Sequence, residues 1–394
     1  MKKKIILVLI CLLFLCGCKD ENKEEEIQPD EVILELNSVN PEVYSHIEIK
    51  DLIKETNVYD YTNEVIDTNE IGIKNVAIHY VYKNKKYVTR TAVNVVDTTP
   101  PLVFGSSSKT VELNYSGDLC GAVRIADYYD STPICVVEGE YDTTNVGTYN
   151  VSLYITDTSG NKVEHPLEVK VVEKIPKTTT TSTKMPKVQF ADAYAKYKND
   201  NTEMGIDVSK WQADVDFEKV RDAGATFVMM RIGVKLKSGD EPVMDSYYLQ
   251  NIKNAKEAGL KVGVYLYSKA LSVDEAKHEA EWVLNALNGE KLDLPIVFDW
   301  EIWDGWSTYH LSLHELNEMA KTYIKTVEDA GYQGMLYGSR NNLVNYWDDD
   351  QIENIWLAHY VTDTGYKGYK MWQFSSTGRI PGIKGDVDLD VMVK

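Results

Sequence analysis

The hydrophobic and polar positions of this chain follow three patterns in succession. Residues 5–15 are almost uniformly apolar and follow a basic start at residues 2–4. From about Pro29, short runs of Val, Ile, Tyr and Thr alternate with Asn, Asp and Gly, a spacing typical of a β-sandwich. From Met204 onwards, strand-like runs alternate with segments that carry apolar residues at helical spacing, which predicts a parallel sheet.

Eight strand-like runs in the C-terminal region predict that this sheet closes into a barrel. The runs cover residues 205–209, 227–233, 261–268, 295–301, 334–339, 355–360, 370–375 and 388–392. The predicted helices cover residues 217–223, 248–258, 273–287 and 313–330, and a glycine lies near the end of each. Because the later connections are too short for full helices, we expect an irregular (β/α) TIM-like barrel.

The fourth of these runs ends in two carboxylates, Asp299 and Glu301, separated by Trp300. Side chains at positions i and i+2 of a strand point the same way, so the two acids lie about 6 to 7 Å apart at Cα and Trp300 points away. Two anions at that spacing repel each other, which raises one pKa and leaves a protonated acid beside an anion. Glycoside hydrolysis uses such a pair, and two solvated acids at a strand end are the alternative.

Two further acids, Asp207 in the first strand and Asp388 at the start of the last, are expected at the same mouth. The first and last strands of a closed barrel are neighbours, and active sites of barrels collect at the C-terminal ends of the strands. Asp207 as a turn cap and Asp388 as a plain strand-end acid are the structural alternatives. The predicted site also includes aromatic side chains whose faces stack on sugar rings: Tyr265, Tyr267, Tyr337, Trp356 and Trp372. Arg231 is expected to pair with one of these acids.

Seven short motifs, in this order along the chain, together resemble glycoside hydrolase family 25, the Chalaropsis-type lysozymes or N-acetylmuramidases. They cover residues 205–212, 227–231, 263–267, 299–301, 356–360, 371–374 and 386–390. The resemblance extends over residues 204–394 and implies a distorted barrel that cleaves the β-1,4 bond between N-acetylmuramic acid and N-acetylglucosamine in peptidoglycan, without a cofactor or metal.

Carried over by position, the resemblance makes Glu301 the general acid and Asp299 the partner carboxylate. Asp299 then either attacks the sugar or steadies an oxazolinium-like intermediate formed by the substrate's acetamido group, and the sequence leaves both routes open. Asp207 and Asp388 would orient the substrate. Three positions depart from the family pattern. The family often has Gly where this chain has Ala213, a polar residue such as His where it has Leu266, and Asn where it has Asp390.

Two other functions remain as alternatives. Residues 298–301 also resemble the end of the acidic strand of family 18 glycosidases, which act on chitin-like polymers, but Leu294 and Val297 occupy the places of the preceding acids. A non-catalytic surface adhesin with a glycan-binding barrel is the third interpretation, against which the presence of all four acids argues.

The N-terminus predicts export. Residues 1–17 have the basic and apolar regions of a signal peptide, too short to span a bilayer comfortably, and Gly17–Cys18 resembles the lipobox of bacterial lipoproteins. We therefore expect a lipid anchor at Cys18 on the outer face of the cytoplasmic membrane, with an ordinary secretory signal as the alternative. Residues 18–28 are too polar to pack and predict a flexible tether.

An internal repeat predicts two small all-β modules, at residues 29–97 and 98–173. Residues 67–76 align with residues 142–151, and the repeated pattern resembles bacterial Ig-like modules, interpreted as spacers. Cys120 and Cys135 either form a disulfide worth roughly 3 kcal/mol in the chain-entropy model or stay as buried thiols. Residues 174–203, rich in Thr, Pro and Lys, form a predicted linker.

Composition excludes one class of partner. The chain has 61 acidic and 42 basic residues, a formal net charge of −19, whereas phosphate binding needs a cationic surface. We therefore expect no nucleic-acid partner, and the oligomeric state is left open. The predicted fold class is a multidomain chain in which two all-β Ig-like sandwiches precede an irregular (β/α) barrel.

Overall fold

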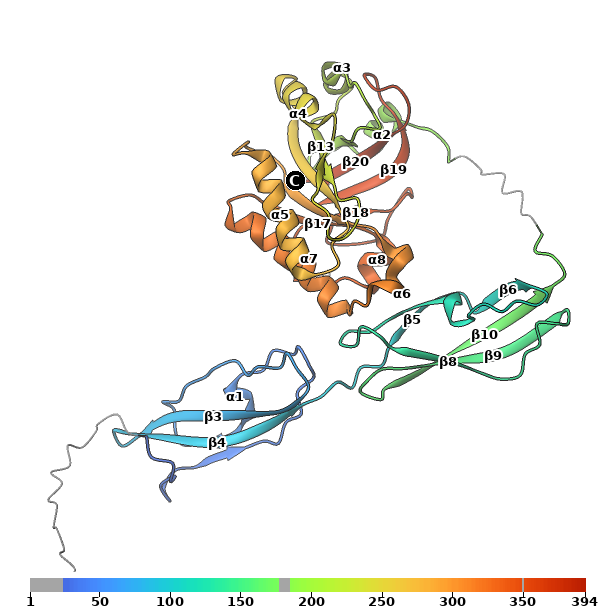
Figure 1. Cartoon of the computed structure of the whole chain (residues 1–394). Helices are drawn as coiled ribbons and strands as arrows, with labels where there is room; N and C mark the ends of the chain where they lie inside the picture. The colour runs from blue at the N-terminus through green and yellow to red at the C-terminus, as the bar shows by residue number, and fades with distance from the viewer. Residues whose placement is uncertain (1–23, 177–184, 349–350) are drawn as a thin grey trace, which may run out of the picture. The chain divides into compact units, whose positions relative to one another are not determined.

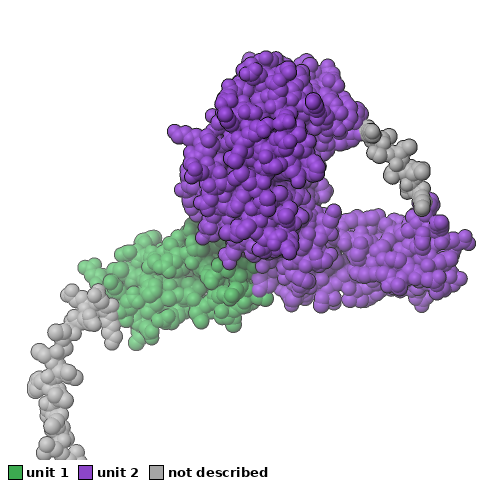
Figure 2. Space-filling model, turned by 45° about the horizontal axis from the view of Figure 1, so that its top comes forward, with its two compact units in different colours: residues 1–98 green, residues 99–394 purple. Residues whose placement is uncertain are grey.

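The computed structural model describes residues 24–176, 185–348 and 351–394, and the chain divides into two compact units, residues 1–98 and 99–394 (Figure 2). The predicted signal peptide, Cys18 and part of the predicted linker lie outside the described residues. No helix in the described part of the chain has both the length and the apolar character needed to span a membrane.

The first unit is built on two antiparallel strand pairs. The long hairpin turns at residues 83–84, both of which have positive φ, as a two-residue turn between twisted strands requires. Buried and less buried side chains alternate along its first strand, which gives this hairpin one apolar face. The elements are β1 (Leu34–Leu36), α1 (Ile49–Leu52), β2 (Ile53–Thr56), β3 (Gly72–Tyr82) and β4 (Lys85–Val95). That this unit is an Ig-like module stays a prediction.

The second unit begins with a β-module whose main sheet has the strand order β6-β10-β9-β8, and β5 pairs separately with β7. Leu153, Ile155 and Val169, which are fully buried, lie in its core. Cys120 and Cys135 are joined by a disulfide. The elements are β5 (Leu102–Gly105), β6 (Ser108–Glu112), η1 (Cys120–Ala122), β7 (Val123–Ala126), β8 (Ile134–Glu138), β9 (Gly147–Thr156) and β10 (Lys162–Val172).

The rest of the second unit alternates strands and helices along the chain (Figure 1). Its strands are β11 (Val188–Gln189), β12 (Thr202–Val208), β13 (Phe227–Val234), β14 (Val243–Met244), β15 (Lys261–Ser268), β16 (Ile296–Trp300), β17 (Gly334–Ser339), β18 (Ile355–Ala358), β19 (Met371–Arg379) and β20 (Val387–Val393). Its helices are α2 (Phe190–Tyr197), α3 (Phe217–Asp222), α4 (Tyr248–Glu257), α5 (Val273–Leu287), η2 (Trp303–Gly305), α6 (Trp306–Tyr309), α7 (Leu313–Asp329) and α8 (Arg340–Asn345).

Eight of the described strands close into a ring in the order β12-β13-β15-β16-β17-β18-β19-β20, and β20 pairs with β12. Neighbouring strands from β12 to β19 run parallel, but β20 is antiparallel to both β19 and β12. The expectation of a parallel sheet is therefore wrong for the last strand. Because β20 runs the other way, its first residues lie at the same end as the last residues of the other strands, and Asp388 pairs in register with Asp207.

Helices α4, α5 and α7 pack on the outside of strands β13 to β17 (Figure 1). Two of them begin at side-chain caps: the Ser272 hydroxyl accepts the Glu275 N–H at the start of α5, and Ser312 and Glu315 form a capping box at the start of α7. Between the later strands the described connections are shorter, which gives the irregular barrel expected from the sequence.

The interior of the ring is filled by large apolar side chains. Met229, Val297, Met335, Trp356 and Met371 form one buried cluster inside the ring of strands. These residues come from five different strands, because alternate positions of each strand point inward. A packed core therefore fills the barrel below its mouth.

Candidate active site

A pocket of about 280 Å³ opens at the mouth of the barrel. It brings together all four acids singled out in the sequence, and its carboxyl, aromatic and amide side chains come from strands distant in the chain. The lining residues are Asp207, Ser209, Trp211, Gln212, Arg231, Tyr265, Tyr267, Asp299, Glu301, Tyr337, Trp356, Tyr360, Gln373 and Asp388. The pocket thus offers acids and aromatic faces to a single ligand.

Strand register explains why several of these side chains meet. Asp299 on β16 is the direct neighbour of Tyr267 on β15 and of Tyr337 on β17, so the three side chains project from one level of the barrel. Glu301 follows the last residue of β16 and is exposed at the mouth, whereas Asp299 is only 4% exposed. The two carboxylates therefore lie one above the other, the deeper one shielded from bulk water.

The Asp299–Glu301 pair retains protons more strongly than free carboxyls do. Burial, followed by the charge of Glu301, raises the pKa of Asp299 well above its usual range. The Glu301 residue as a whole is exposed, but its carboxyl lies in the pocket, where partial burial raises its pKa and the contact with Asp299 only partly opposes this rise. One proton shared between two close carboxyls removes most of their mutual repulsion, and the raised pKa values favour this state, in which one carboxyl is protonated and the other is ionised.

Gln373 orients a second acid, Asp207. Its amide oxygen accepts hydrogen bonds from the hydroxyls of Tyr337 at 3.0 Å and Tyr360 at 2.9 Å, and its Nε2 donates to Asp207 Oδ2 at 2.8 Å. With both hydroxyls donating to the amide oxygen, the Nε2 group is the end of the amide that faces the acid. Gln373 thereby connects two tyrosines of the pocket wall to a carboxylate that is only 5% exposed.

Two acids on β20 complete a cluster with Asp207. Asp390 is fully buried and accepts the Trp356 indole N–H at 2.9 Å, and burial raises its pKa well above the usual range. Asp388 lines the pocket, and burial together with the charges of Asp207 and Glu301 raises its pKa to about 9. This cluster, of which Asp388 lines the pocket and Asp390 lies buried beside it, therefore holds carboxyls that keep their protons to higher pH than exposed acids do.

Arg231 pairs with an acid that the sequence did not single out. Its Nε and Nη2 atoms donate to Asp245 Oδ2 at 2.8 and 2.6 Å, and the same oxygen accepts the Lys210 N–H at 3.0 Å. The expectation that Arg231 pairs with one of the four acids of the mouth is therefore wrong. Asp245 fixes the guanidinium at the edge of the pocket, beside the turn that carries Trp211.

Trp372 lies outside the pocket, contrary to the prediction that it contacts substrate. Its indole N–H donates to the carbonyl of His359 at 2.8 Å, and its ring packs edge-to-face on Tyr197 with centroids 5.5 Å apart. Tyr265, Tyr267, Tyr337, Trp356 and Arg231, in contrast, do line the pocket. The catalytic and substrate-binding roles of all these residues stay predictions.

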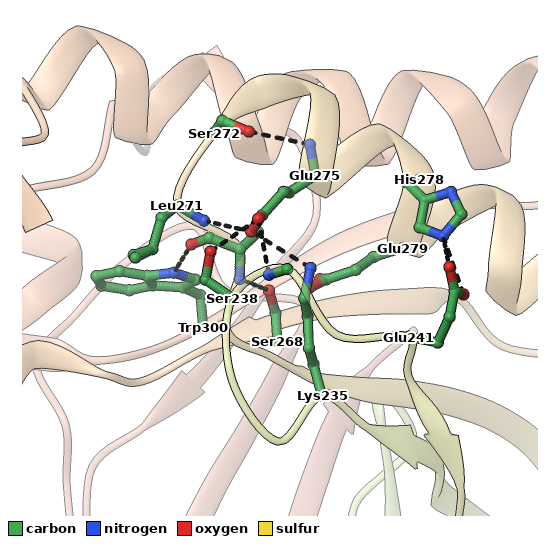
Figure 3. Close-up of polar contacts among 12 residues, drawn as sticks. Lys235, Ser238, Glu241, Ser268, Leu271, Ser272, Glu275, His278, Glu279 and Trp300 are labelled. Carbon is green, nitrogen blue, oxygen red and sulfur yellow. Dashed lines mark hydrogen bonds and ion pairs between the residues drawn. The ribbon is translucent and has the colours of Figure 1, made fainter.

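Trp300, between the two acids, points away from the pocket and anchors the end of β16. Its indole N–H donates to the Ala270 carbonyl at 2.8 Å, and the next residue, Leu271, donates its N–H to Glu275 Oε2 at 3.0 Å. Figure 3 shows Lys235 reaching toward both Glu275 and Glu279, at 3.3 Å from an oxygen of each. A buried ion cluster thus supports the strand that carries Asp299 and Glu301.

Several lining residues were missed by sequence reasoning: Ser209, Trp211, Gln212, Tyr360 and Gln373. All five lie in motifs that carry the family resemblance, which was the available signal. Trp211 is 76% exposed at the pocket rim, where an indole face is free to stack on a sugar. Asp245 lies outside those motifs, and its contact with Arg231 depends on a loop that the periodicity does not define.

Comparison with known proteins gives one family match, to glycosyl hydrolases family 25 over residues 206–383. The uncharacterized protein YegX of Escherichia coli (strain K12) is 29% identical over 196 residues, which cover 48% of this chain and 68% of that protein. The autolytic lysozyme of Clostridium acetobutylicum is 28% identical, covering 47% of this chain and 54% of its own. Among solved structures, the spore cortex lytic enzyme SleM of Clostridium perfringens aligns with a TM-score of 0.44 at 23% identity, covering 50% of this chain and 68% of SleM.

Proposed function

We infer the function from one premise: residues 206–383, in the C-terminal half of this chain, form a glycosyl hydrolases family 25 domain and hence a glycoside hydrolase of the lysozyme type. We propose that it cleaves the β-1,4 bond between N-acetylmuramic acid and N-acetylglucosamine in peptidoglycan. The autolytic lysozyme among its relatives supports this substrate.

The paired carboxyls Asp299 and Glu301 are the observation that carries the proposal. Hydrolysis of a glycosidic bond needs one group that gives a proton to the leaving oxygen and a second that stabilises positive charge on the sugar. A pair with raised pKa values supplies both in one place. The aromatic walls of the pocket, with Trp211 exposed at its rim, suit a neutral sugar polymer.

In the proposed mechanism Glu301 is the general acid, because it is exposed at the mouth where a substrate oxygen can reach it. Asp299, deeper in the pocket, keeps its negative charge when Glu301 holds the shared proton, and it stabilises the sugar or the oxazolinium formed by the substrate's acetamido group. Asp207 and Asp388 orient the substrate. As a protonated acid, Asp388 is able to donate a hydrogen bond that an ionised carboxylate cannot.

Replacement of the acid tests this function. Glu301→Gln keeps the shape of the side chain but cannot give a proton, so release of reducing sugar from purified peptidoglycan is expected to fall by at least about a hundredfold. Glu281→Gln, at an exposed position of α5, is the matched control and should keep full activity. Unchanged hydrolysis by Glu301→Gln would remove Glu301 from the role, whereas a folded wild-type chain that binds peptidoglycan without cleaving it would be the adhesin.

The products identify the bond. Mass analysis after borohydride reduction is expected to find the reduced end on N-acetylmuramic acid, because that sugar loses its link to the next residue. Peptidoglycan from which the acetyl groups have been removed should be a much poorer substrate if the acetamido group takes part. Reduced ends on N-acetylglucosamine would instead assign the domain as a glucosaminidase.

The proposal also includes attachment of the chain to the outer face of the cytoplasmic membrane through lipid on Cys18, with the two β-modules as spacers. A Cys18→Ala variant, expressed in a bacterium that processes lipoproteins and is fed a labelled fatty acid, is expected to lose the label that the wild-type chain carries. A variant that stays labelled, or an unlabelled wild-type chain, would contradict anchoring at this residue.

A further inference from the structure

The disulfide-closed loop, residues 120–135 of the second β-module, packs directly on the hydrolase domain. The Cys120–Cys135 bond closes this loop. Within it, Ala126 is 2% exposed and belongs to the same hydrophobic cluster as the barrel helices. On the adjacent strand β5, Phe104 packs against Tyr346 with ring centroids 4.5 Å apart. The loop and the barrel therefore share one apolar core inside the unit 99–394.

The loop contacts residues 302–309, called here the tryptophan segment. This segment directly follows the proposed general acid, Glu301, and is hydrogen-bonded to its carbonyl. Glu301 O accepts the Trp303 N–H at 2.9 Å. From the other side, Ile125 O accepts the Trp306 indole N–H at 2.8 Å, and the Arg124 guanidinium carbon lies 5.8 Å from the centroid of the Trp303 ring. The segment that leaves Glu301 is thus held from outside the barrel by the β-module.

The same contacts reach the strand that carries the two acids. The Trp303 ring meets Trp300 edge-to-face with centroids 4.8 Å apart, and Arg124 also donates to the Tyr346 hydroxyl at 3.1 Å. Aromatic pairs at this separation resist displacement because each ring fills the space beside the other. Arg124 therefore lies two contacts away from the residue between Asp299 and Glu301.

The loop also caps helix α7, which follows the tryptophan segment. The first N–H groups of a helix have no partner within the helix. Here the Asp127 carbonyl accepts the Leu313 N–H at 2.7 Å and the Tyr128 carbonyl accepts the His314 N–H at 3.1 Å. Because α7 packs against β16 and β17, these two bonds fix the start of the helix that supports the proposed catalytic strand from behind.

We propose that the disulfide-closed loop is a positioning element of the hydrolase, which holds residues 302–315 and thereby sets the position of Glu301. Glu301 lies just beyond the end of β16, so the ladder of strand hydrogen bonds does not hold it. A displacement of about 1 Å in a reacting group is enough to cost a large part of the rate. The kinetic part of this inference rests on the proposed lysozyme function, and the loop contacts do not.

The test uses the full chain with three substitutions. Arg124→Ala removes the cation above Trp303 and the hydrogen bond to Tyr346, whereas Arg124→Lys keeps a cation and is the conservative variant. Lys170→Ala is the matched control, because Lys170 belongs to the same β-module but pairs there with Glu168. For each protein, kcat and KM on soluble peptidoglycan are measured across pH, together with amide hydrogen exchange of peptides covering residues 301–316.

Arg124→Ala is expected to lower kcat roughly three- to thirtyfold, the range that coupling through packed contacts produces, while KM changes less than about twofold. It should also shift the basic limb of the kcat profile, since Glu301 no longer holds a fixed place beside Asp299. Arg124→Lys should recover most of the loss, and Lys170→Ala should match the wild type. Exchange in residues 301–316 should rise only in Arg124→Ala.

Two results distinguish the positioning role of the loop from the proposed lysozyme function. Wild-type exchange, kcat and pH profile in Arg124→Ala would overturn the positioning role even if the wild-type chain is an active lysozyme. If instead the wild type proves inactive, faster exchange of residues 301–316 in Arg124→Ala would still establish that the loop holds this segment, and the proposed function alone would fail.

Discussion

Asp388 illustrates how position converts an ordinary side chain into an unusual one. An exposed aspartate is ionised above about pH 4, but burial and the charges of Asp207 and Glu301 raise the pKa of Asp388 to about 9. Burial also raises the pKa values of Asp207, Asp299 and Asp390, and the charge of a neighbouring carboxylate is a further cause for each. These carboxyls therefore keep their protons to higher pH than exposed acids do, which lessens the mutual repulsion within the cluster.

These acids are expected to make the protein less stable as the pH rises. The folded state keeps a proton on Asp388 that the unfolded chain releases, so this contribution is complete below pH 3.8 and is lost as the pH rises towards about 9. Asp388→Asn removes one such proton, and the decline in the free energy of unfolding between these pH values should become less steep. Urea unfolding at a series of pH values measures the slope.

The control for this experiment lies two residues away. The hydrogen bond from Lys187 lowers the pKa of Asp386, so its titration falls below pH 3.8, outside the window. Asp386→Asn should therefore change the slope between pH 4 and 9 much less than Asp388→Asn does, because the charge of Asp386 is only the smallest of the causes that raise the pKa of Asp388. Equal slopes in wild type and Asp388→Asn would contradict a raised pKa at Asp388.

The strands and helices of the barrel follow the pattern of apolar and polar residues along the chain, and for that reason much of the site was predictable. Apolar residues at helical spacing and glycines near helix ends marked α3, α4, α5 and α7, and the acids at the ends of predicted strands pointed to one mouth. The predicted linker is wrong over α2, because Phe190 of this helix is buried in the core of the barrel. The direction of β20 was not predictable, because an alternating strand has the same period whichever way it runs. Its antiparallel course is what places Asp388 opposite Asp207.

Neighbouring positions of β19 explain the mistaken prediction at Trp372. Adjacent residues of a strand face opposite sides, and Gln373 points into the barrel to bind Asp207, so Trp372 must point outward. The pairing of Arg231 with Asp245 depends on where the chain leaves β14, which no periodicity defines. Ala213, where the family often has glycine, adopts a φ of 52°, the left-handed conformation that glycine favours.

The loop after β13 is tied to helix α5 by a buried ion cluster (Figure 3). Lys235 is 1% exposed and lies between Glu275 and Glu279. Burial opposes the ionisation of Glu275, but hydrogen bonds from Ser238 and the Leu271 N–H outweigh it and lower its pKa, whereas burial raises the pKa of Glu279. The cluster therefore balances one lysine against one firmly ionised carboxylate and a second that is more readily protonated.

Lys235→Met is expected to destabilise the protein by roughly 3 to 5 kcal/mol, because it leaves a buried carboxylate without its counter-charge. Glu279→Gln is the matched change on the other side of the cluster. It should cost only about 1 kcal/mol, since burial already favours the neutral form of that carboxyl. Urea unfolding compares the two variants, and equal losses would show that Lys235 does not serve mainly as the counter-ion of Glu275.

Across the molecule as a whole, the disulfide is expected to stabilise only one of the two compact units. Cys120 and Cys135, 15 residues apart, belong to the unit of residues 99–394, and closing a loop of that length is worth about 3 kcal/mol in the chain-entropy model. Replacing both cysteines with serine should lower the urea midpoint of that unit. Tryptophan emission reports on this unfolding, because all described tryptophans lie in residues 99–394.

Proteolysis of the first unit provides the control. Its described residues are held by their own strand pairs and contain no cysteine of the disulfide, so the rate at which a protease cuts within residues 24–98 should not change when the bond is lost. Faster cutting within residues 24–98 as well would contradict an effect confined to residues 99–394, and an unchanged urea midpoint would contradict a stabilising disulfide.

The reversed course of β20 also decides where additions to the chain are tolerated. Since the strand starts at the mouth, it finishes on the opposite rim, where the Lys394 N–H donates to the carbonyl of Asn201 just before β12. A fluorescent reporter fused after Lys394 should therefore emerge away from the pocket at the mouth and leave entry of the proposed glycan substrate unhindered. Such a fusion would allow enzyme bound on intact cell walls to be followed by microscopy.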